Sequence, residues 1–242
     1  MTDHFAGRIA DTYDRDLPES FSPAVLDPAV RSLATLARNG PCLEFAIGTG
    51  RVALPLQKMG LQIDGIEYSP DMVRQLRMKP GGGEINVQIG DMAIVDMGKQ
   101  YALVFLVFNT IMNLTTQTQQ VHCFRNAARH LLPGGKFVLE VMVPDLRRYP
   151  PGAMAVAFDV SSRHLGFDIY AMAEQKLWSH HVTIDEAGAA LYHVHPFRYV
   201  WPAELDLMAE LAGMKPVSRH ADWIGTPFVD ESRQHVSVWE KV

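Results

Sequence analysis

Three things that this chain largely lacks narrow the classes to which it can belong. Its 242 residues include two cysteines, Cys42 and Cys123, which stand far apart among apolar neighbours. We therefore expect neither a disulfide framework nor a cysteine metal site, and reduced thiols are the simple interpretation. No apolar run approaches the roughly 18 residues of a membrane-spanning helix. The net charge of −5 lacks the basic excess of a nucleic-acid-binding protein.

The chain also begins without the apolar segment of a secretory signal, because its first residues are polar and acidic. Together with the two cysteines, this predicts a cytoplasmic protein without a membrane partner. The length suits one large domain, or one core domain with an inserted cap. An apolar fraction of 48% is ordinary for a globular protein with a core.

The most informative stretch present is 41–69, which predicts a strand, a glycine turn, a helix and a second strand. The apolar strand Cys42–Ala46 runs into a loop with Gly48 and Gly50. Glycines let the chain turn tightly and let a ligand approach the backbone. The second strand ends on Glu67, whose carboxylate could accept hydrogen bonds from two ribose hydroxyls. The unit therefore predicts a site for a nucleoside.

Further strands alternate with helical patterns along the chain, which predicts a parallel, doubly wound sheet with helices on both faces. Continuous apolarity over Tyr101–Phe108 indicates a central strand. Two aromatic and β-branched segments, Asp168–Val182 and Leu191–Trp201, predict an antiparallel pair. The strands expected for the main sheet are 42–46, 62–67, 85–89, 101–108, 136–143, 214–220 and 234–240.

Proline and glycine clusters and the change of composition after Pro144 divide the chain into four parts. We expect an N-terminal helical lid at 1–40 and a nucleoside-binding core at 41–149. An antiparallel cap follows at 150–201. The C-terminal helix and last two strands, at 202–242, complete the core sheet.

Two cofactors compete for the glycine loop. The run from Gly48 to Ala53 satisfies the dinucleotide fingerprint G-x-G-x-x-G/A, with Glu67 at the ribose position. Glu44, however, lies where an NAD site has no use for a carboxylate, whereas a ligand ammonium would pair with one. Asp91 adds a second acid after the third strand, suited to the exocyclic amine of a purine. These acids favour S-adenosyl-L-methionine (SAM) over NAD.

With these residues the sequence resembles the class I (Rossmann-like) SAM-dependent methyltransferases of the small-molecule type. The family's first motif, acid-x-G-x-G-x-G, stands as Glu44-Phe45-Ala46-Ile47-Gly48-Thr49-Gly50, with Ala46 in place of the first glycine. The resemblance covers about residues 10–145. Other positions that match family motifs are Tyr13 in the lid, Glu67, Tyr68 and Met72 after strand two, Asp91 and Met92 after strand three, Asn109 after strand four, and the turn 131–135.

The resemblance implies a seven-stranded Rossmann-like sheet and the cofactor roles of these positions. Glu44, Ala46 and the Gly48–Gly50 backbone would hold the methionine end. The adenosine would lie among the acids and their neighbours, with Asn109 beside it and Tyr13 closing the lid. The implied chemistry is an in-line methyl transfer to N, O or C that leaves S-adenosyl-L-homocysteine. Because the donor is already activated, positioning and water exclusion carry the reaction, and no catalytic residue is assigned.

The acceptor is expected to be a small molecule. The family's nucleic-acid amine methylators carry Asn/Asp-Pro-Pro-aromatic after strand four, whereas this chain has Phe108-Asn109-Thr110-Ile111. Asn113 lies one turn beyond and could face the acceptor or cap a loop. In the cap, alternate residues of each segment would share a face. These are His193, His195, Phe197, Tyr199 and Trp201 in one segment, and Tyr170, Met172, Trp178 and His180 in the other.

From this face we take Tyr170, His195 and Tyr199 as candidate acceptor contacts, with Arg198 beside them for a carboxylate or phosphate. The same face could instead form a homodimer interface or pack on the core, and Arg198 could form a surface ion pair. The pairs His180-His181 and His193/His195 suggest a metal site. No acid or cysteine stands at ligand spacing from them, so we expect no bound metal. Asp14, Asp16 and Glu19 are interpreted as a solvated helix face.

The sequence thus predicts a SAM-dependent methyltransferase acting on a small molecule. Two alternatives stay open. One is an NAD(P)-dependent oxidoreductase on the same fold. The other is a non-catalytic protein that binds a nucleoside ligand.

Overall fold

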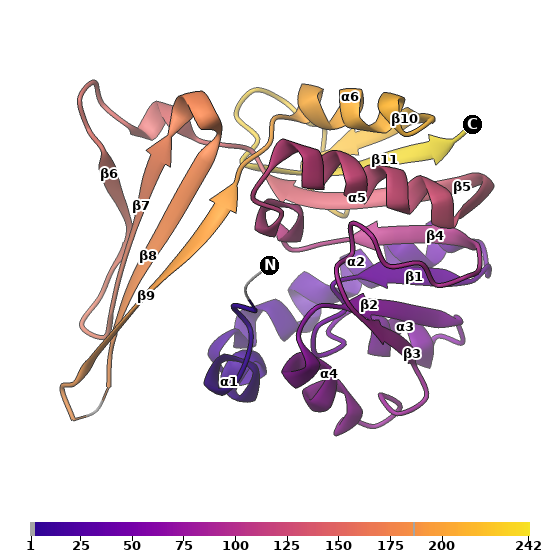
Figure 1. Ribbon diagram of the computed structural model, residues 1–242, viewed down its shortest axis with the longest axis horizontal. Coiled ribbons are helices and arrows are strands. Elements are labelled where there is room, and N and C mark those ends of the chain that lie inside the picture. The colour runs from indigo at the N-terminus through magenta and orange to yellow at the C-terminus, as the bar shows by residue number, and fades with distance from the viewer. Residues whose placement is uncertain (1–2, 186) are drawn as a thin grey trace.

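The computed structural model describes residues 3–185 and 187–242 as a mixed α/β protein with two sheets. The larger sheet has seven strands in the order β10-β11-β5-β4-β1-β2-β3 (Figure 1). Its strands are β1 (Cys42–Phe45), β2 (Ile63–Glu67), β3 (Asn86–Ile89), β4 (Tyr101–Leu106), β5 (Leu131–Met142), β10 (Met214–His220) and β11 (Gln234–Lys241). The predicted seven-stranded, doubly wound sheet is confirmed.

Strand direction follows from the connections between the strands. The strands β1 to β5 are joined through helices or long loops and pair in parallel, as β1 does with β2 and β4. The last two strands break the pattern, because β11 pairs antiparallel with both β5 and β10. All parallel strands end at the same edge of the sheet, which is where a doubly wound fold places its ligand.

The described residues form six α-helices in addition to the two sheets. They are α1 (Arg8–Asp16), α2 (Pro23–Ala37), α3 (Ala53–Lys58), α4 (Pro70–Arg77), α5 (Gln117–His130) and α6 (Pro202–Leu211). Local sequence determines where α4 begins, because the Ser69 hydroxyl caps the helix and Pro70 occupies its first turn. A capping box of Thr116 and Gln119 begins α5. No helix within the described residues is both long and apolar enough to cross a membrane.

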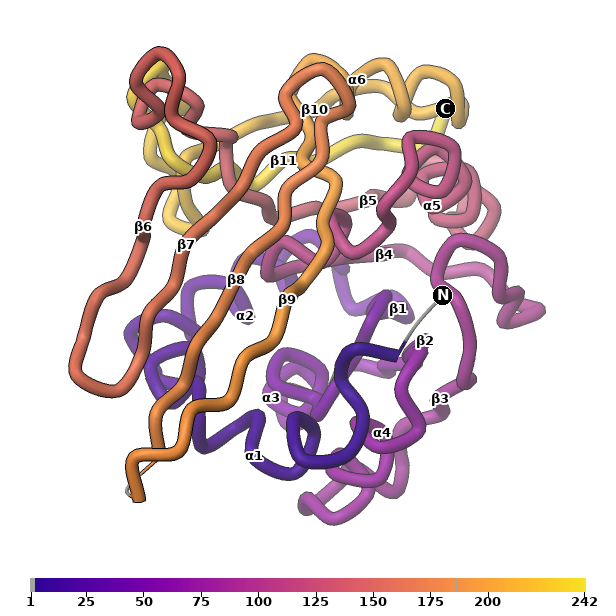
Figure 2. The backbone as a smooth tube through the Cα atoms, turned by 60° about the vertical axis from the view of Figure 1, so that its left-hand side comes forward, coloured from indigo at the N-terminus to yellow at the C-terminus, as the bar shows by residue number. Residues whose placement is uncertain are grey.

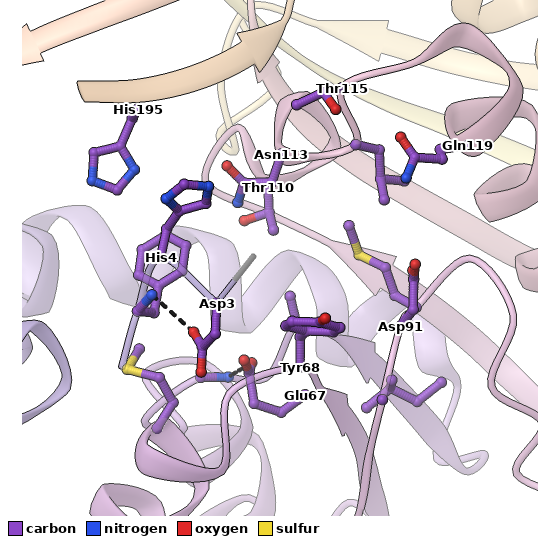
Figure 3. Close-up of a pocket in the computed structure, with 18 of the residues that line it drawn as sticks. Asp3, His4, Glu67, Tyr68, Asp91, Thr110, Asn113, Thr115, Gln119 and His195 are labelled. Carbon is purple, nitrogen blue, oxygen red and sulfur yellow. Dashed lines mark hydrogen bonds between the residues drawn. The ribbon is translucent and has the colours of Figure 1, made fainter. Parts of the chain in front are cut away.

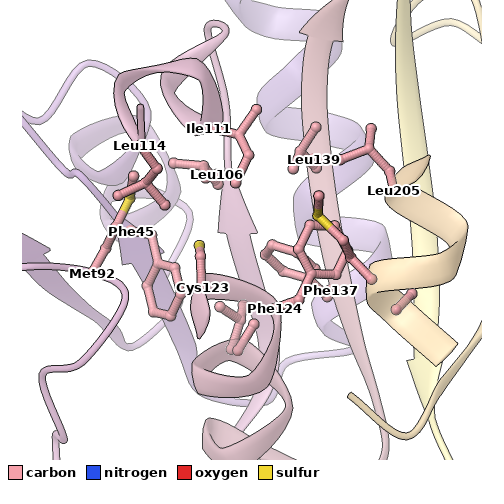
Figure 4. Close-up of a cluster of buried hydrophobic side chains, with 14 of the residues drawn as sticks. Phe45, Met92, Leu106, Ile111, Leu114, Cys123, Phe124, Phe137, Leu139 and Leu205 are labelled. Atoms are coloured by element: carbon pink, nitrogen blue, oxygen red, sulfur yellow. The ribbon is translucent and has the colours of Figure 1, made fainter. Parts of the chain in front are cut away.

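The core consists of two apolar layers, one on each face of the main sheet. One layer packs α2 and α3 against the sheet through Leu33 and Leu56. The other packs α5 and α6 through Phe124 and Leu205, and Figure 4 shows this second layer around Phe137. Both layers meet the central strand β4, in which Leu103, Val104, Phe105 and Leu106 are nearly inaccessible to solvent. Burial on both faces explains why this strand is apolar throughout.

The cap is a separate four-stranded antiparallel sheet in the order β6-β7-β8-β9. Its strands are β6 (Ala155–Val160), β7 (His164–Ala171), β8 (Lys176–Ile184) and β9 (Ala190–Arg198). Figure 1 shows it standing beside the main sheet, and in Figure 2 its strands run to the left of β1 and β2. The N-terminal segment runs between the cap and the core in both views.

The predicted cap had too few strands. The expected strand Asp168–Val182 is a hairpin of β7 and β8, because the chain reverses through a short 3-10 turn, η4 (Met172–Glu174), before the left-handed residue Gln175. Tyr170 pairs with Leu177, whereas Trp178 pairs with Ile169. Tyr170 and Trp178 therefore lie on opposite faces, which corrects the expected shared face of Tyr170, Met172, Trp178 and His180. The strand β6 was not predicted.

Candidate functional site

One cavity of about 360 Å³ lies between the strand ends of the core, the N-terminal segment and the cap. Figure 3 shows Glu67, Tyr68 and Asp91 on its lower side and Asn113, Thr115 and His195 on its upper side. The residues that line it are Asp3, His4, Phe5, Tyr13, Ala46, Gly48, Ile66, Glu67, Tyr68, Met72, Gly90, Asp91, Met92, Thr110, Asn113, Leu114, Thr115, Gln119, His195 and Pro196. Six stretches that are far apart in the sequence, 3–13, 46–48, 66–72, 90–92, 110–119 and 195–196, thus share one wall.

The glycine loop after β1 forms part of this wall through its backbone. Gly48 has a φ of 56° and Gly50 a φ of 80°, both in the left-handed region that favours glycine. A Cβ added to Gly50 would lie 2.4 Å from Leu76 Cδ1, so this glycine also lets the loop pack on α4. Ala46 adopts a φ of 53° despite its side chain. Strain of this kind is typical of backbone shaped for a ligand.

Glu67 stands at the tip of β2, and the backbone around it holds its carboxylate in place. Its Oε2 accepts a hydrogen bond from Gly48 N–H at 2.8 Å, and its Oε1 accepts one from Ser69 N–H at 2.9 Å. Burial raises the pKa of Glu67, while these backbone N–H groups act in the opposite direction. The glycine loop and the acid of strand two are therefore joined by a hydrogen bond.

Next to Glu67, the lower side of the cavity wall also contains Asp91, Met72 and Met92. Asp91 Oδ1 accepts a hydrogen bond from Ala93 N–H at 2.8 Å, which orients the carboxylate at the strand tip. The sulfur-bearing side chains are buried, and Tyr68 lies beside Glu67 in Figure 3. An acid, an aromatic ring and two soft apolar side chains can surround a flat base with an exocyclic amine.

The glycine loop and Lys79, which follows α4, hold the N-terminal segment against the core. Tyr13 of α1 lines the cavity, and burial raises the pKa of its hydroxyl. Thr49 of the glycine loop donates its hydroxyl to Asp14 Oδ1 at 2.6 Å, and its carbonyl accepts from Lys79 Nζ at 2.7 Å. Lys79 also forms an ion pair with Asp14. We call Asp14, Thr49 and Lys79 the lid latch.

The lid latch corrects the interpretation of Asp14 as part of a solvated face. Asp16 differs, since its partners Thr12 and Arg15 belong to the same helix. A second set of contacts joins α1 and α4, in which Gln75 Nε2 donates to Asp11 Oδ1 at 2.7 Å. Gly7 N–H donates to Asp71 Oδ2 at 2.6 Å just before α1. These polar contacts therefore attach the N-terminal segment to the core.

Three predicted cofactor residues do not line the cavity. Gly50 faces α4, as described above. Glu44 is buried in β1, with Oε2 lacking a hydrogen-bond partner in the described part of the chain. Burial raises the pKa of Glu44 well above its ordinary value, and the charge of Arg51 and Ala53 N–H oppose this only in part. Asn109 turns away, because its Oδ1 accepts from Met142 N–H at 2.6 Å.

Asn109 instead belongs to a strained turn after β4. Phe108 and Asn109 have φ values of 59° and 62°, an unusual pair of left-handed residues without a glycine. Glu140 of β5 holds the turn, since its Oε2 accepts from Phe108 N–H at 3.0 Å and its Oε1 from Trp223 Nε1–H at 2.7 Å. The turn leads directly into η2 (Thr110–Asn113), which carries two cavity residues.

The upper side of the cavity has a different chemistry. Thr110, Asn113, Thr115 and Gln119 supply neutral polar groups, and His195 with Pro196 reaches in from β9 (Figure 3). Asn113 and His195 were predicted acceptor contacts, and the structure places both in the wall. Residues that sequence reasoning missed are Asp3, His4, Phe5, Thr110, Thr115, Gln119 and Pro196. No periodic pattern marks them, because they meet only through the fold.

Three predicted acceptor contacts lie outside the cavity wall. Arg198 is buried at the root of the cap, where its Nη2 pairs with Glu204 Oε1 at 2.7 Å and Gln175 Oε1 at 3.0 Å. A guanidinium engaged in this way is not available to an acceptor carboxylate or phosphate. Tyr170 and Tyr199 pack their rings 5.3 Å apart, and Tyr199 donates its hydroxyl to Met172 O at 3.2 Å.

The donor groups of the lower side fit SAM. Two carboxylates after neighbouring strands and a backbone turn in the left-handed region suit a cationic nucleoside better than a pyrophosphate. Within the described residues no Lys or Arg side chain lines the cavity, which leaves a pyrophosphate without a cation.

Known proteins agree with this arrangement. Residues 42–135 match the model of the family described as "Methyltransferase domain". The structure of the CcbJ methyltransferase from Streptomyces caelestis is 35% identical, with a TM-score of 0.86 over 97% of this chain and 96% of that one. This chain belongs to the class I SAM-dependent methyltransferases. The predicted family, enzyme class and cofactor are therefore confirmed, and the oxidoreductase alternative is set aside.

More distant relatives extend the comparison. The cypemycin N-terminal methyltransferase of Streptomyces sp is 23% identical over 95% of this chain and 97% of its own length. The SAM-bound structure of CalS10, an amino pentose methyltransferase from Micromonospora echinaspora, shares the fold with a TM-score of 0.72. It is 18% identical, and the match covers 100% of both chains.

Proposed function

We propose that this methyltransferase transfers the methyl group of SAM to an amine nitrogen of a small, polar acceptor, such as an amino sugar or the amino group of a peptide. The names of two relatives support an amine, since one is a cypemycin N-terminal methyltransferase and another an amino pentose methyltransferase. The neutral polar groups of Thr110, Asn113 and Gln119 support an acceptor with several hydroxyl or amide groups.

One observation carries this proposal: the two sides of the site belong to a single cavity. The acids Glu67 and Asp91 line the same space of about 360 Å³ as Asn113 and His195. A methyl donor held on the lower side would therefore present its methyl group to an acceptor held on the upper side. Methyl transfer needs such proximity more than it needs acid or base groups.

The residues in the wall suggest how the donor is held. Glu67 would accept the ribose hydroxyls, and Asp91 the adenine amine, with Tyr68, Met72 and Met92 around the base. The backbone at Ala46 and Gly48 would pass beside the methionine part. SAM supplies a methyl group already activated by a positive sulfur. The protein then has to orient the two reactants and keep water out.

Residues 1–40 would act as the lid, with Tyr13 as its cavity-facing side chain. The core 41–149 would hold the donor, and 150–201 would cover the acceptor. We further propose a cytoplasmic enzyme, supported by two free, buried cysteines. A homodimer through the outer face of the cap is supported by exposed apolar residues there, among them Leu165 and Tyr192.

Calorimetric titration with S-adenosylhomocysteine tests the donor half of the proposal. We expect wild type to bind and Glu67→Ala to lose affinity by roughly 10- to 100-fold, because charge-assisted hydrogen bonds contribute about 1.5–3 kcal/mol. Asp16→Ala is the matched control, since this acid is exposed on α1 and contacts its own helix. No binding to wild type, or equal binding by Glu67→Ala, would contradict the proposal.

A panel of amines, incubated with SAM and analysed by mass spectrometry, tests the acceptor half. Amino sugars and N-terminal amines of short peptides represent the proposed classes. A gain of one methyl group on nitrogen supports the proposal. Methylation confined to hydroxyl-only sugars and phenols included in the same panel would contradict it.

A further inference from the structure

Four histidines form a row on one face of the cap. They are His164 on β7, His181 on β8, and His193 and His195 on β9. His181 lies directly opposite His193 in the antiparallel register, and His193 and His195 are alternate residues of one strand. Their side chains therefore share a face of the sheet. We call them the histidine row.

The row reaches from the cavity to an acid at the other edge of the cap. The rings of His195 and His193 lie 5.3 Å apart, and those of His193 and His181 stack at 4.8 Å. His181 Nδ1 and His164 Nε2 are joined by a hydrogen bond of 2.9 Å. His164 Nδ1 in turn lies 2.5 Å from Asp159 Oδ2. A proton placed on His164 would thus have a carboxylate beside it.

His195 is the member of the row that lines the cavity. Its ring packs on His4 at 5.4 Å and on Phe5 at 5.9 Å, both from the N-terminal segment. Figure 3 shows it on the upper side, across from Glu67. Within the part of the chain that the structure describes, neither ring nitrogen of His195 has a hydrogen-bond partner. A lone pair is therefore free at the acceptor side.

The charges around the cavity favour a cationic acceptor. The side chains of Asp3, Glu67 and Asp91 bring carboxylates to its wall, and no Lys or Arg of the described residues does so. Burial lowers the pKa of His195 to about 4, with the charges of His193 and His4 acting in the same direction. The imidazole is consequently neutral at pH 7. A neutral imidazole in an acidic cavity suits an ammonium group rather than an anion.

We propose that His195 accepts the proton of the acceptor's ammonium group before the methyl group is transferred. The inference rests on the proposed N-methylation, and it assigns a base where the family's chemistry does not require one. An ammonium beside a sulfonium is disfavoured by like-charge repulsion, which promotes loss of its proton.

The step balances as follows. The N–H bond of the ammonium breaks, its proton joins an imidazole nitrogen of His195, and the electron pair stays on the amine nitrogen. That pair forms the new N–C bond while the C–S bond breaks and its electrons stay on sulfur. The two positive charges present at the start end on the methylated nitrogen and on the imidazolium.

Other groups of the cavity fit this role less well. Asp3 Oδ1 already accepts a hydrogen bond from Phe5 N–H at 2.9 Å, and Figure 3 places Asp3 next to Glu67 on the donor side. Burial raises the pKa of Tyr13, which keeps its hydroxyl protonated. A metal-bound base is unsupported, because among the described residues no three His, Cys, Asp or Glu side chains are placed so that they could hold a metal ion together.

The test compares His195→Asn with wild type on the amine panel. We expect kcat to fall by about 10²- to 10⁴-fold, the usual contribution of a general base. Affinity for S-adenosylhomocysteine should stay within twofold of wild type, because His195 lies on the acceptor side. His180→Asn is the matched control, since His180 is on the opposite face of β8, stacked on Phe167 at 4.7 Å.

Two further readouts separate a base from a packing residue. Added imidazole should restore turnover to His195→Ala, and should not do so for Tyr13→Phe. The ring proton on Cε1 of His195, followed by NMR, should not titrate between about pH 5.5 and 8. The titratable groups that face His195 are His4, His193 and His181, so His193→Asn should move the acidic limb of the pH–rate profile to higher pH.

The outcomes divide cleanly. Turnover that persists in His195→Asn within threefold of wild type, or a failure of imidazole to rescue His195→Ala, overturns the base and leaves N-methylation standing. Failure of wild type to methylate any amine overturns the proposed function and this inference with it. A large loss of kcat with imidazole rescue and unchanged donor affinity supports both.

Discussion

The two sides of the cavity are built in different ways. The proposed donor side consists of strand ends and turns of the parallel sheet, where Gly48 N–H and Glu67 are joined directly. The proposed acceptor side consists of side chains from the cap, the N-terminal segment and η2, which contribute His195, His4 and Asn113. The first is a property of the backbone, and the second is a property of side chains on separate elements.

The difference teaches which side can vary. A backbone turn that requires left-handed residues tolerates few substitutions, because a Cβ at such positions is strained. A wall of side chains on a separate sheet can change its chemistry without disturbing that turn. Variants on one side should therefore leave the function of the other side largely intact, and the following predictions test this separation in order of decreasing effect.

The largest effect is expected at the root of the cap. Arg198→Met removes the partner of Glu204 and leaves a carboxylate with 15% side-chain exposure uncompensated. Breaking a buried pair in this way costs about 3–5 kcal/mol in the free energy of unfolding. Urea denaturation measures the loss.

Arg198→Met/Glu204→Met is the control for this prediction, because it removes both charges and should regain most of the loss. If the folded Arg198→Met variant bound S-adenosylhomocysteine more than threefold more weakly than wild type, the two sides would not be separate.

An intermediate effect is expected on the donor side at Glu44. Glu44→Gln replaces a buried carboxyl whose Oε2 has no partner among the described residues, so we expect a gain of about 1–3 kcal/mol in the free energy of unfolding near pH 8. The pKa of Glu44 is raised by folding, so the wild type loses stability as the pH rises from about 4.5 through the folded pKa. Denaturation at several pH values measures this gain, which should vanish toward the acidic end.

The same variant shows what Glu44 does. If it meets the donor ammonium, Glu44→Gln should bind S-adenosylhomocysteine more weakly in calorimetry. Asp64→Asn is the control for this binding measurement. Asp64 is a buried acid of β2 that accepts a hydrogen bond from Tyr101 and does not line the cavity. A variant that is less stable than wild type at pH 8 would contradict the argument from burial.

The smallest effect is expected at the lid latch. Asp14→Asn weakens a partly exposed ion pair with Lys79 and a hydrogen bond from Thr49, together about 1 kcal/mol. S-adenosylhomocysteine should dissociate roughly fivefold faster in stopped-flow fluorescence, with little change in unfolding. Added salt should speed dissociation from wild type more than from the variant.

Asp16→Asn on the same helix should leave the dissociation rate unchanged. An equal rate for Asp14→Asn and wild type would show that the lid does not depend on the latch.

The parts of this molecule that sequence reasoning predicted correctly are local in the chain. The glycine loop, Glu67 and Asp91 each lie at or just after the end of a strand. The apolar run of β4 indicates that this strand is buried on both faces. Because parallel strands end at one edge, placing these acids together needed only the strand order.

What was missed depends on contacts between distant segments. The latch joins residues 35 positions apart in Asp14 and Thr49. The hairpin of β7 and β8 was read as one strand, because the reversal at Gln175 uses a left-handed residue that is not glycine. Arg198 looked like an exposed charge, yet partners from α5 and α6 enclose it. No pattern within one segment contains such information.

The buried contacts of Arg198 also bear on how ligands enter and leave the cavity. Because these contacts tie the end of β9 to α5 and α6, we expect the cap to stay fixed to the core at this point. The helix α1 is attached to α4 through exposed polar contacts. We therefore expect any opening of the cavity to occur at α1 rather than at the foot of the cap.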